Sequence, residues 1–230
     1  MINMTKNFNN RLITSIIPKN IHEFEKLLNN CNTLYVEHRL DGLEDLNNYR
    51  IDYSNFSHKF VVSLRPKSSG GLYDSDEETR IKILKKAINS GISHVDIEFE
   101  TEQNNIKSLI QFSHQHNVEV IISSHNFEKT PTIQKLKVNC NKMILMGADI
   151  IKYVCKANNI EDGHTMICLQ QEIDFPIISF SMGEIGSFTR IVSLLYGAKF
   201  SYVSSNRKTA PGQLSAKEMI DLLSILNFTG

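Results

Sequence analysis

The chain has 230 residues, and its 25 basic side chains balance 25 acidic ones, so the formal net charge is zero. A neutral chain has no electrostatic attraction for nucleic acid or for an anionic membrane surface, and we expect neither as a partner. With 41% hydrophobic residues the chain can bury a sizeable core, and we expect one domain that spans residues 1–230.

The sequence indicates no membrane segment, disulfide framework or metal site. Its apolar runs fall short of the roughly 18 residues of a spanning helix, and residues 1–10 are too polar for the core of a signal peptide. The four cysteines have neither CxxC nor histidine-rich spacing. We therefore expect a cytoplasmic protein with reduced thiols and no bound metal.

Short apolar runs, several of them rich in valine and isoleucine, alternate with amphipathic helical patterns along the chain. The predicted strands are residues 12–17, 33–40, 60–64, 94–99, 118–123, 149–154, 176–181 and 200–204. The predicted helices are residues 20–29, 76–89, 104–116, 131–146, 158–171, 186–196 and 215–226. The segment 42–56 has the weakest pattern, and we expect a short helix there at most.

Eight strands that alternate with helices predict a (β/α)8 TIM barrel of the α/β class. The alternative is an open doubly wound sheet, which uses the same alternation, but eight units favour the closed barrel. In such a barrel the functional side chains lie at the C-terminal ends of the strands and in the loops that follow. The position of a polar residue within its unit therefore bears on its function.

A lysine interrupts the sixth predicted strand, where Lys152 stands between Ile151 and Tyr153. An amine in an apolar interior loses the hydration of its charged form, so its pKa should fall. A neutral amine is a nucleophile towards ketones and aldehydes. The alternative is that Lys152 lies at the end of the strand and extends its amine into water.

Acid–base groups end the two preceding strands. Asp96, Glu98 and Glu100 alternate with apolar residues, so at least one carboxylate faces the interior or the mouth of the barrel. His125 lies where the fifth strand leaves the barrel. Glu98, His125 and Lys152 would then be neighbours around the rim, and a carboxylate that orients a histidine beside a lysine is an acid–base arrangement. The alternative for a lone histidine is a structural role.

The second strand ends in a run of charges. Alternation places Glu37, Arg39 and Asp41 on one face of this strand and His38 on the other. Three charged side chains on one face of a barrel strand cannot pack as part of an apolar core. They either serve the site or pair with each other at the strand end.

Two arginines and a polar loop complete the predicted rim. Arg65 ends the third strand, and Arg190 lies in the first turn of the seventh helix, a region where many barrels bind phosphate. A guanidinium fork binds phosphate and carboxylate equally well, although both arginines could instead face solvent. After the eighth strand, Thr209 and Gln213 belong either to an ordinary turn or to a lid that hydrogen-bonds a polyol.

Taken together, these motifs resemble the type I 3-dehydroquinate dehydratases (3-dehydroquinases). The matching segments, in chain order, are residues 37–41 (EHRLD), 96–98 (DIE), 123–131 (SSHNFEKTP), Lys152, 181–183 (SMG) through Arg190, and 210–213 (APGQ). Each motif alone is weak, but all of them in order and over nearly the whole chain are specific.

The resemblance implies a (β/α)8 barrel, usually a homodimer, that dehydrates 3-dehydroquinate in the shikimate pathway without a metal or an organic cofactor. It implies that Lys152 forms a Schiff base with the C3 ketone, that His125 is the general acid and base, and that Glu98 is the partner of His125. It also implies substrate-binding roles for Ser15, Glu37, His38, Arg39, Arg65, Met182, Arg190, Thr209 and Gln213.

Three positions depart from the family pattern. Thr209 stands at a position that resembles a family serine, Ser69 where relatives often have glutamate, and Glu184 where a basic residue is familiar. Two other functions stay open at this point. One is a lysine-dependent aldolase of class I, which usually acts on phosphorylated sugars, and the other is a catalytically silent barrel that serves as a binding module.

Overall fold

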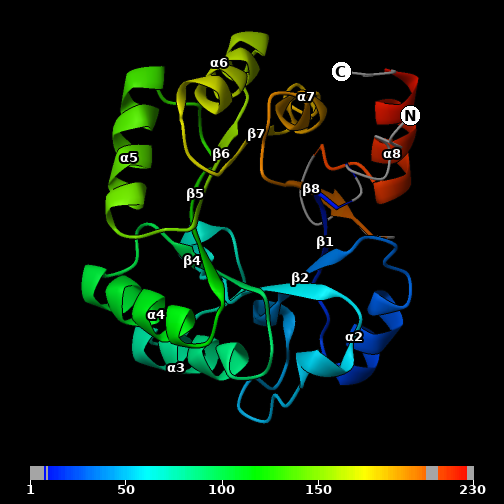
Figure 1. Ribbon diagram of the computed structural model, residues 1–230, viewed down its shortest axis with the longest axis vertical. Helices are drawn as coiled ribbons and strands as arrows, with labels where there is room; N and C mark the ends of the chain where they lie inside the picture. The colour runs from blue at the N-terminus through cyan, green and yellow to red at the C-terminus, as the bar shows by residue number, and fades with distance from the viewer. Residues whose placement is uncertain (1–7, 9, 206–211, 227–230) are drawn as a thin grey trace.

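Eight parallel strands form one sheet that curves into a nearly closed barrel, with the helices outside it (Figure 1). The structure is a computed structural model that describes residues 8, 10–205 and 212–226. The order of the strands in the sheet is β7-β6-β5-β4-β3-β2-β1-β8. At the seam between β7 and β8, the two ends of this order, the amide of Lys199 just before β8 donates to the Ile177 carbonyl at 2.8 Å. The predicted barrel is thereby confirmed against the open sheet.

The strands are β1 (Leu12–Ile16), β2 (Tyr35–Arg39), β3 (Lys59–Ser63), β4 (His94–Glu98), β5 (Glu119–Asn126), β6 (Ile150–Lys156), β7 (Ile177–Met182) and β8 (Ser201–Ser204). The helices are α2 (Ile21–Leu28), α3 (Glu77–Ile88), α4 (Gln103–Gln115), α5 (Ile133–Leu145), α6 (Ile160–Glu172), α7 (Thr189–Leu195) and α8 (Ala216–Ile225). Three short 3₁₀ helices are η1 (Leu40–Gly42), η2 (Tyr53–Asn55) and η3 (Lys67–Ser69).

Side-chain caps fix where most helices begin. Asn20, Asp76, Thr132, Asn159 and Ser215 each accept a hydrogen bond from a backbone amide in the first turn of the helix that follows. Between β2 and β3 the chain forms η1 and η2 instead of an α-helix, as the weak pattern of that segment predicted.

Apolar side chains fill the barrel and the layer between the sheet and the helices. Inside the barrel, Ile13, Val61, Ile121, Ile150 and Ile178 form one buried cluster, which closes the interior and leaves the polar residues at the C-terminal mouth. Alternate residues face the helices and form a larger cluster.

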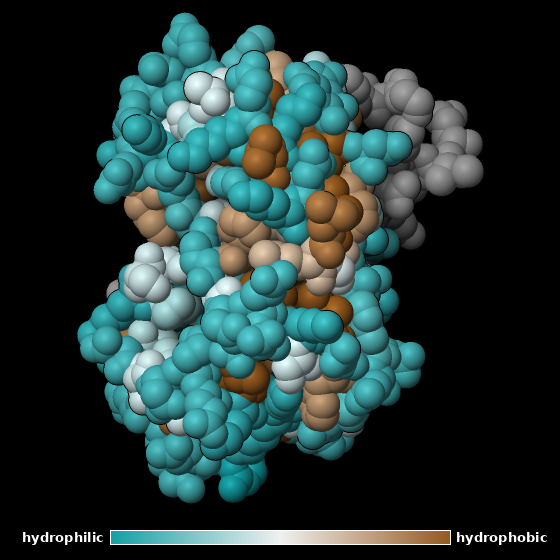
Figure 2. Space-filling view, turned by 90° about the vertical axis from the view of Figure 1, so that its left-hand side faces the viewer, coloured by the Kyte–Doolittle hydropathy of each residue, from teal (hydrophilic) through white to brown (hydrophobic). Residues whose placement is uncertain are grey.

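None of the helices in the described ranges has the length and hydrophobicity to cross a bilayer. Figure 2 shows the face that carries α4 and α5, where hydrophilic side chains predominate and hydrophobic ones gather in a central band.

His38 lies in the outer layer, on the side of β2 that faces away from the barrel interior. It is fully buried, its Nδ1 lies 2.8 Å from the Tyr53 hydroxyl, and its ring centroid lies 4.6 Å from that of Phe24. The substrate-binding role expected for His38 is therefore wrong, because strand alternation turns it away from its neighbours Glu37 and Arg39. Burial lowers the pKa of His38 to about 3.

This buried imidazole should make the stability of the protein depend on pH. In the unfolded chain a histidine binds a proton as the pH falls through about 6.5, whereas folded His38 stays neutral down to about 3. Its contribution is therefore complete above pH 6.5 and is lost as the pH falls towards 3. Replacing His38 with phenylalanine should reduce the pH slope of the unfolding free energy between pH 6 and 4 by about 1.4 kcal/mol per unit.

Urea unfolding of both proteins across this pH range measures the two slopes. Loss of the Tyr53 hydrogen bond lowers the stability of the variant at every pH, so the slope is the relevant quantity. Equal slopes would show that His38 carries a proton in the folded protein.

Candidate active site

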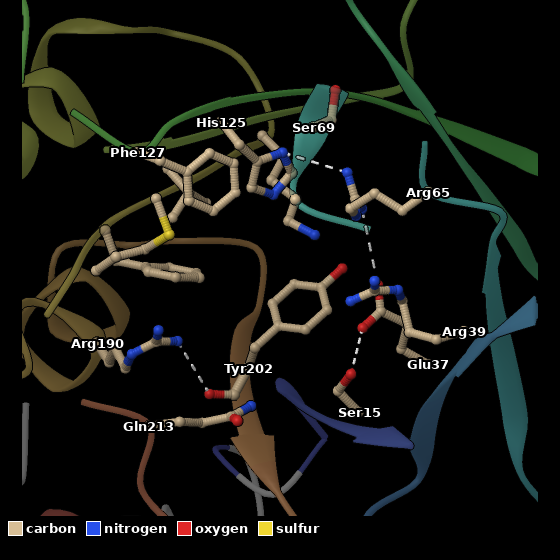
Figure 3. Close-up of a pocket in the computed structure, with 15 residues that line it drawn as sticks. Ser15, Glu37, Arg39, Arg65, Ser69, His125, Phe127, Arg190, Tyr202 and Gln213 are labelled. Carbon is tan, nitrogen blue, oxygen red and sulfur yellow. Dashed lines mark hydrogen bonds and ion pairs between the residues drawn. The ribbon is translucent and has the colours of Figure 1, made fainter. Parts of the chain in front are cut away.

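A cavity of about 100 Å³ opens at the C-terminal mouth of the barrel (Figure 3). Its lining is Ser15, Glu37, Arg39, Arg65, Ser69, Gly70, His125, Phe127, Lys152, Val154, Phe180, Met182, Arg190, Tyr202 and Gln213. Most of the residues predicted from the sequence are thus brought together. Glu98 and His38 lie outside the lining, and Thr209 falls outside the described residues.

Lys152 points into the barrel rather than into water. Its side chain is only 5% exposed, and its Nζ lies 3.0 Å from Asp96 Oδ2 and 3.9 Å from the centroid of the Tyr202 ring. Burial lowers the pKa of Lys152, although Asp96 and Glu37 oppose this effect. The alternative in which the amine extends to solvent is therefore wrong, and the amine is held for chemistry inside the pocket.

Asp96 is the carboxylate that faces Lys152. It is fully buried, it accepts a hydrogen bond from the Ser123 hydroxyl at 2.6 Å, and it pairs with Arg65 Nη2 at 3.1 Å. Burial acts to raise the pKa of Asp96, but Arg65 and Lys152 outweigh it and hold the pKa below its ordinary value. Asp96 is thus an ionised counter-ion to the amine, a role that we did not assign to it from the sequence.

Glu98 is held by two arginines behind the pocket. Its Oε1 lies 3.0 Å from Arg65 Nη1, and its Oε2 lies 2.5 Å from Nη1 of Arg80 on α3. The direct contact expected between Glu98 and His125 is therefore replaced by an indirect one, because the Arg65 guanidinium lies between them. Sequence reasoning missed Arg80, whose only local signal is its helical i,i+3 pair with Glu77.

His125 is a neutral imidazole with a defined proton position. Nη1 of Arg65 lies 3.2 Å from its Nδ1, and because a guanidinium can only donate, Nδ1 accepts and Nε2 carries the proton. Burial, with further contributions from Arg65 and Lys152, holds the pKa of His125 well below its ordinary value. No carboxylate within the described part of the chain lies within 4.0 Å of this ring. Ser69 also lines the pocket.

The charges that end β2 are neutralised in separate groups. The Ser15 hydroxyl donates to Glu37 Oε2 at 2.5 Å, and Ser63 donates to Oε1 of the same carboxylate at 3.2 Å. Arg39 makes a bidentate contact with Asp41, in which Nε donates to Oδ1 at 2.8 Å and Nη2 donates to Oδ2 at 2.6 Å. Both alternatives for this strand end therefore apply, since Glu37 and Arg39 line the pocket and also have partners of their own.

The loop after β3 closes one wall of the pocket. Gly70 has a left-handed backbone with φ 77°, and a Cβ at this position would overlap the Phe127 ring. The Phe127 ring in turn stacks on His125, with an angle of 16° between the ring planes. A glycine is therefore required where the loop meets the wall that Phe127 and His125 form.

Arg190 is a buried cation at the opposite wall. It is 1% exposed, its Cζ lies 4.2 Å from the centroid of the Phe180 ring, and its Nη1 donates to the Tyr202 carbonyl at 3.4 Å. Burial lowers the pKa of Arg190 to about 10. Across the described ranges, no carboxylate pairs with it. The pocket thus presents a guanidinium that can receive an anion.

The site combines an amine nucleophile, its carboxylate counter-ion, a neutral imidazole and an arginine available to an anion. This combination on a (β/α)8 barrel is typical of enzymes that act on carbonyl compounds through a lysine. A family model described as Type I 3-dehydroquinase matches residues 13–229. The chain belongs to this family, which consists of hydro-lyases.

Relatives agree with this assignment, and a solved structure agrees with the fold. The chain is 33% identical over 217 residues to the 3-dehydroquinate dehydratase of Pyrococcus abyssi, covering 94% of this chain and 98% of that one. It is 33% identical over 196 residues to the enzyme of the same name from Methanococcus maripaludis, covering 84% and 88%. The fold matches a type I 3-dehydroquinate dehydratase from Clostridium difficile with a TM-score of 0.88 at 24% identity, covering 94% of this chain and 92% of that one.

The Arg80–Glu98 pair should be important for stability. Replacing Arg80 with glutamine leaves Glu98 with a single cation in a buried position, and breaking such a pair from one side should cost about 3 kcal/mol of unfolding free energy. Lys82→Gln is a matched control on the same helix, because its pair with Glu78 is exposed and should contribute little to the unfolding free energy. Urea unfolding compares the variants. Equal losses would contradict the importance of the buried pair.

Proposed function

We propose that this chain dehydrates 3-dehydroquinate to 3-dehydroshikimate in the shikimate pathway, through a Schiff base on Lys152. The observation that carries the proposal is the Lys152 amine, buried in the barrel mouth 3.0 Å from Asp96. Membership of the Type I 3-dehydroquinase family, and relatives that are named 3-dehydroquinate dehydratases, support the choice of substrate.

Lys152 begins the reaction by adding to the C3 ketone. Burial favours the neutral amine that this step needs, since it lowers the pKa of the ammonium group. Loss of water from the adduct gives an iminium ion, which withdraws electrons and acidifies the neighbouring C2 proton. The electron sink is thus made from the side chain and the substrate, and the reaction requires neither a metal nor an organic cofactor.

His125 transfers the protons. Its low pKa keeps the ring neutral, as a base must be. It removes the C2 proton, the enamine expels the C1 hydroxyl, and the imidazolium protonates the leaving oxygen. Water then hydrolyses the new imine, which releases 3-dehydroshikimate and restores the Lys152 amine. The lone pair of the neutral ring lies on Nδ1, to which Arg65 donates. His125 can therefore act as a base only after this hydrogen bond is exchanged, so substrate must draw Arg65 away or the ring must turn.

The remaining lining suits an anionic polyol. Arg190 is the cation available for the substrate carboxylate, because it is buried in the pocket wall without a described carboxylate partner. Ser15, Glu37 and Gln213 offer hydroxyl, carboxylate and amide groups for the ring hydroxyls, while Met182 supplies apolar contact. Arg39 and Arg65 add donors on the other side of the pocket. Thr209 keeps its proposed role on the resemblance alone.

The resemblance to the family also supports a proposal for the domain organisation, the location and the oligomeric state of the protein. The chain would act as a single catalytic domain over residues 1–230, in a cytoplasmic homodimer. The zero net charge agrees with a small-molecule substrate rather than nucleic acid or membrane as the partner.

Removing the amine should abolish the reaction. Lys152→Ala should lower turnover by at least about 10⁴-fold, because no solvent amine replaces the electron sink. His125→Ala should slow turnover by about 10²- to 10⁴-fold and still form the covalent adduct. Turnover is followed by the ultraviolet absorbance of the conjugated enone product, and the adduct by borohydride reduction with substrate and mass spectrometry.

Lys156→Ala is the matched control for this experiment, because it removes an exposed lysine from the end of the same strand and should leave turnover unchanged. An adduct on another residue, or none in the wild type, would refute the Schiff base on Lys152. Binding of 3-dehydroquinate without turnover would instead favour the silent barrel.

Arg190 should contribute to binding at a cost to stability. Arg190→Met should raise KM by about 30- to 1,000-fold, since a buried charge pair with the substrate is lost. The free variant should be at least as stable as the wild type, because a buried guanidinium without a carboxylate is costly to hold. Steady-state kinetics and thermal unfolding measure both effects. A lower kcat at unchanged KM, or a lower melting temperature, would argue against carboxylate binding.

A further inference from the structure

The eighth strand carries a phenol into the pocket that neither strand patterning nor the family resemblance identified. Tyr202 is the second residue of β8, and its side chain is largely buried. Its hydroxyl is buried without a hydrogen-bond partner among the described residues. Figure 3 shows this hydroxyl at the centre of the pocket, directed towards Glu37 and Arg39. Buried tyrosine hydroxyls usually have a partner, so this one is in position to bond with a ligand.

The ring of Tyr202 lies against the reacting amine. Lys152 Nζ is 3.9 Å from the ring centroid, so the amine sits over the ring face. The phenol oxygen is at the edge of this ring. An oxygen on the carbon that Lys152 attacks lies two bonds from Nζ and is within reach of that edge. One carbonyl group can therefore contact the amine through its carbon and the hydroxyl through its oxygen.

The surroundings of the phenol keep it protonated. Burial raises the pKa of Tyr202 well above its ordinary value, and the nearby carboxylates Glu37 and Asp96 raise it further. A phenol in this state is a hydrogen-bond donor and a poor acid. It can stabilise negative charge on a nearby oxygen without losing its proton.

We infer that Tyr202 is a further catalytic residue, whose hydroxyl donates a hydrogen bond to the oxygen of the ketone that Lys152 attacks. The inference rests on the proposed Schiff-base function. In the step concerned, a bond forms between Nζ and the ketone carbon, and the π electron pair of the carbonyl moves onto its oxygen. A proton of the attacking nitrogen then passes to this oxygen and gives the neutral carbinolamine. The phenol stabilises the charged oxygen during this step and keeps its own proton.

Packing alone does not account for the hydroxyl. The Tyr202 ring contacts Phe180, with centroids 6.2 Å apart, and a phenylalanine ring would make the same contact. A buried hydroxyl without a hydrogen-bond partner lowers the stability of a folded protein. Removing the oxygen should therefore leave the free protein as stable as before or more stable, while the reaction loses a donor.

The test is Tyr202→Phe in the full chain, with 3-dehydroquinate as the probe. Enzyme and substrate are mixed, quenched with borohydride after defined times, and the adduct on Lys152 is quantified by mass spectrometry. At saturating substrate the rate constant of adduct formation should fall about 10- to 100-fold, as expected for one lost hydrogen bond to a charged oxygen. The substrate concentration for half-saturation should change by less than about threefold, and the melting temperature should not fall.

Tyr153→Phe is the matched control. Tyr153 follows Lys152 on β6 but faces outwards, where its hydroxyl contacts Asn139 at 2.9 Å, so its loss should not change the trapping rate. Equal trapping rates in Tyr202→Phe and the wild type would overturn the inference. A raised half-saturation concentration at an unchanged saturating rate would also overturn it, because the hydroxyl would then bind a ring hydroxyl of the substrate.

The same experiment separates this inference from the proposed function. Absence of an adduct in the wild type would overturn both. An adduct on Lys152 in the wild type, with no loss of rate in Tyr202→Phe, would overturn the role of Tyr202 alone.

Discussion

Arg65 holds two carboxylates at once in the barrel mouth, Asp96 at 3.1 Å and Glu98 at 3.0 Å, and the site is arranged around this contact. Buried charges are tolerated only when they are paired and hydrogen-bonded. Arg80 completes the coordination of Glu98, and Lys152 completes that of Asp96. Helix α3 and strands β3, β4 and β6 are therefore tied together through ionised groups. The amine acquires its position and its counter-ion from the same network.

Two polar groups stand outside this compensation. Arg190 has no carboxylate partner and the Tyr202 hydroxyl has no hydrogen-bond partner within the described ranges, although both are buried in the pocket. In a protein interior such groups reduce stability, and they are tolerated where a ligand completes them. The charged groups around Arg65 are thus paired within the protein, whereas Arg190 and the Tyr202 hydroxyl are left for a ligand. We expect the oxygen atoms of the substrate to lie beside these two groups.

The periodicity of the sequence was sufficient to predict the barrel, since alternating strands and helices left few other arrangements. The same reasoning placed Lys152 and His125 at the mouth, because strand ends converge there. It could not determine which carboxylate, Asp96 or Glu98, pairs with Lys152, because the two share one face of β4 and differ only in depth within the barrel. Nor could it find Arg80 or Tyr202, since their contacts depend on packing between distant segments. Strand alternation alone places His38 on the outer face of β2. The substrate-binding role came from the family resemblance, which applies to the motif of residues 37–41 but not to each residue in it.

The pair between Lys152 and Asp96 has a consequence for the energy of the reaction. Asp96 lies 3.0 Å from the nitrogen that would carry the positive charge of the iminium. The carboxylate is therefore in position before this charge forms. Little reorganisation energy is needed when the neutral amine becomes the cationic iminium, because the ion that stabilises the cation is already oriented towards it.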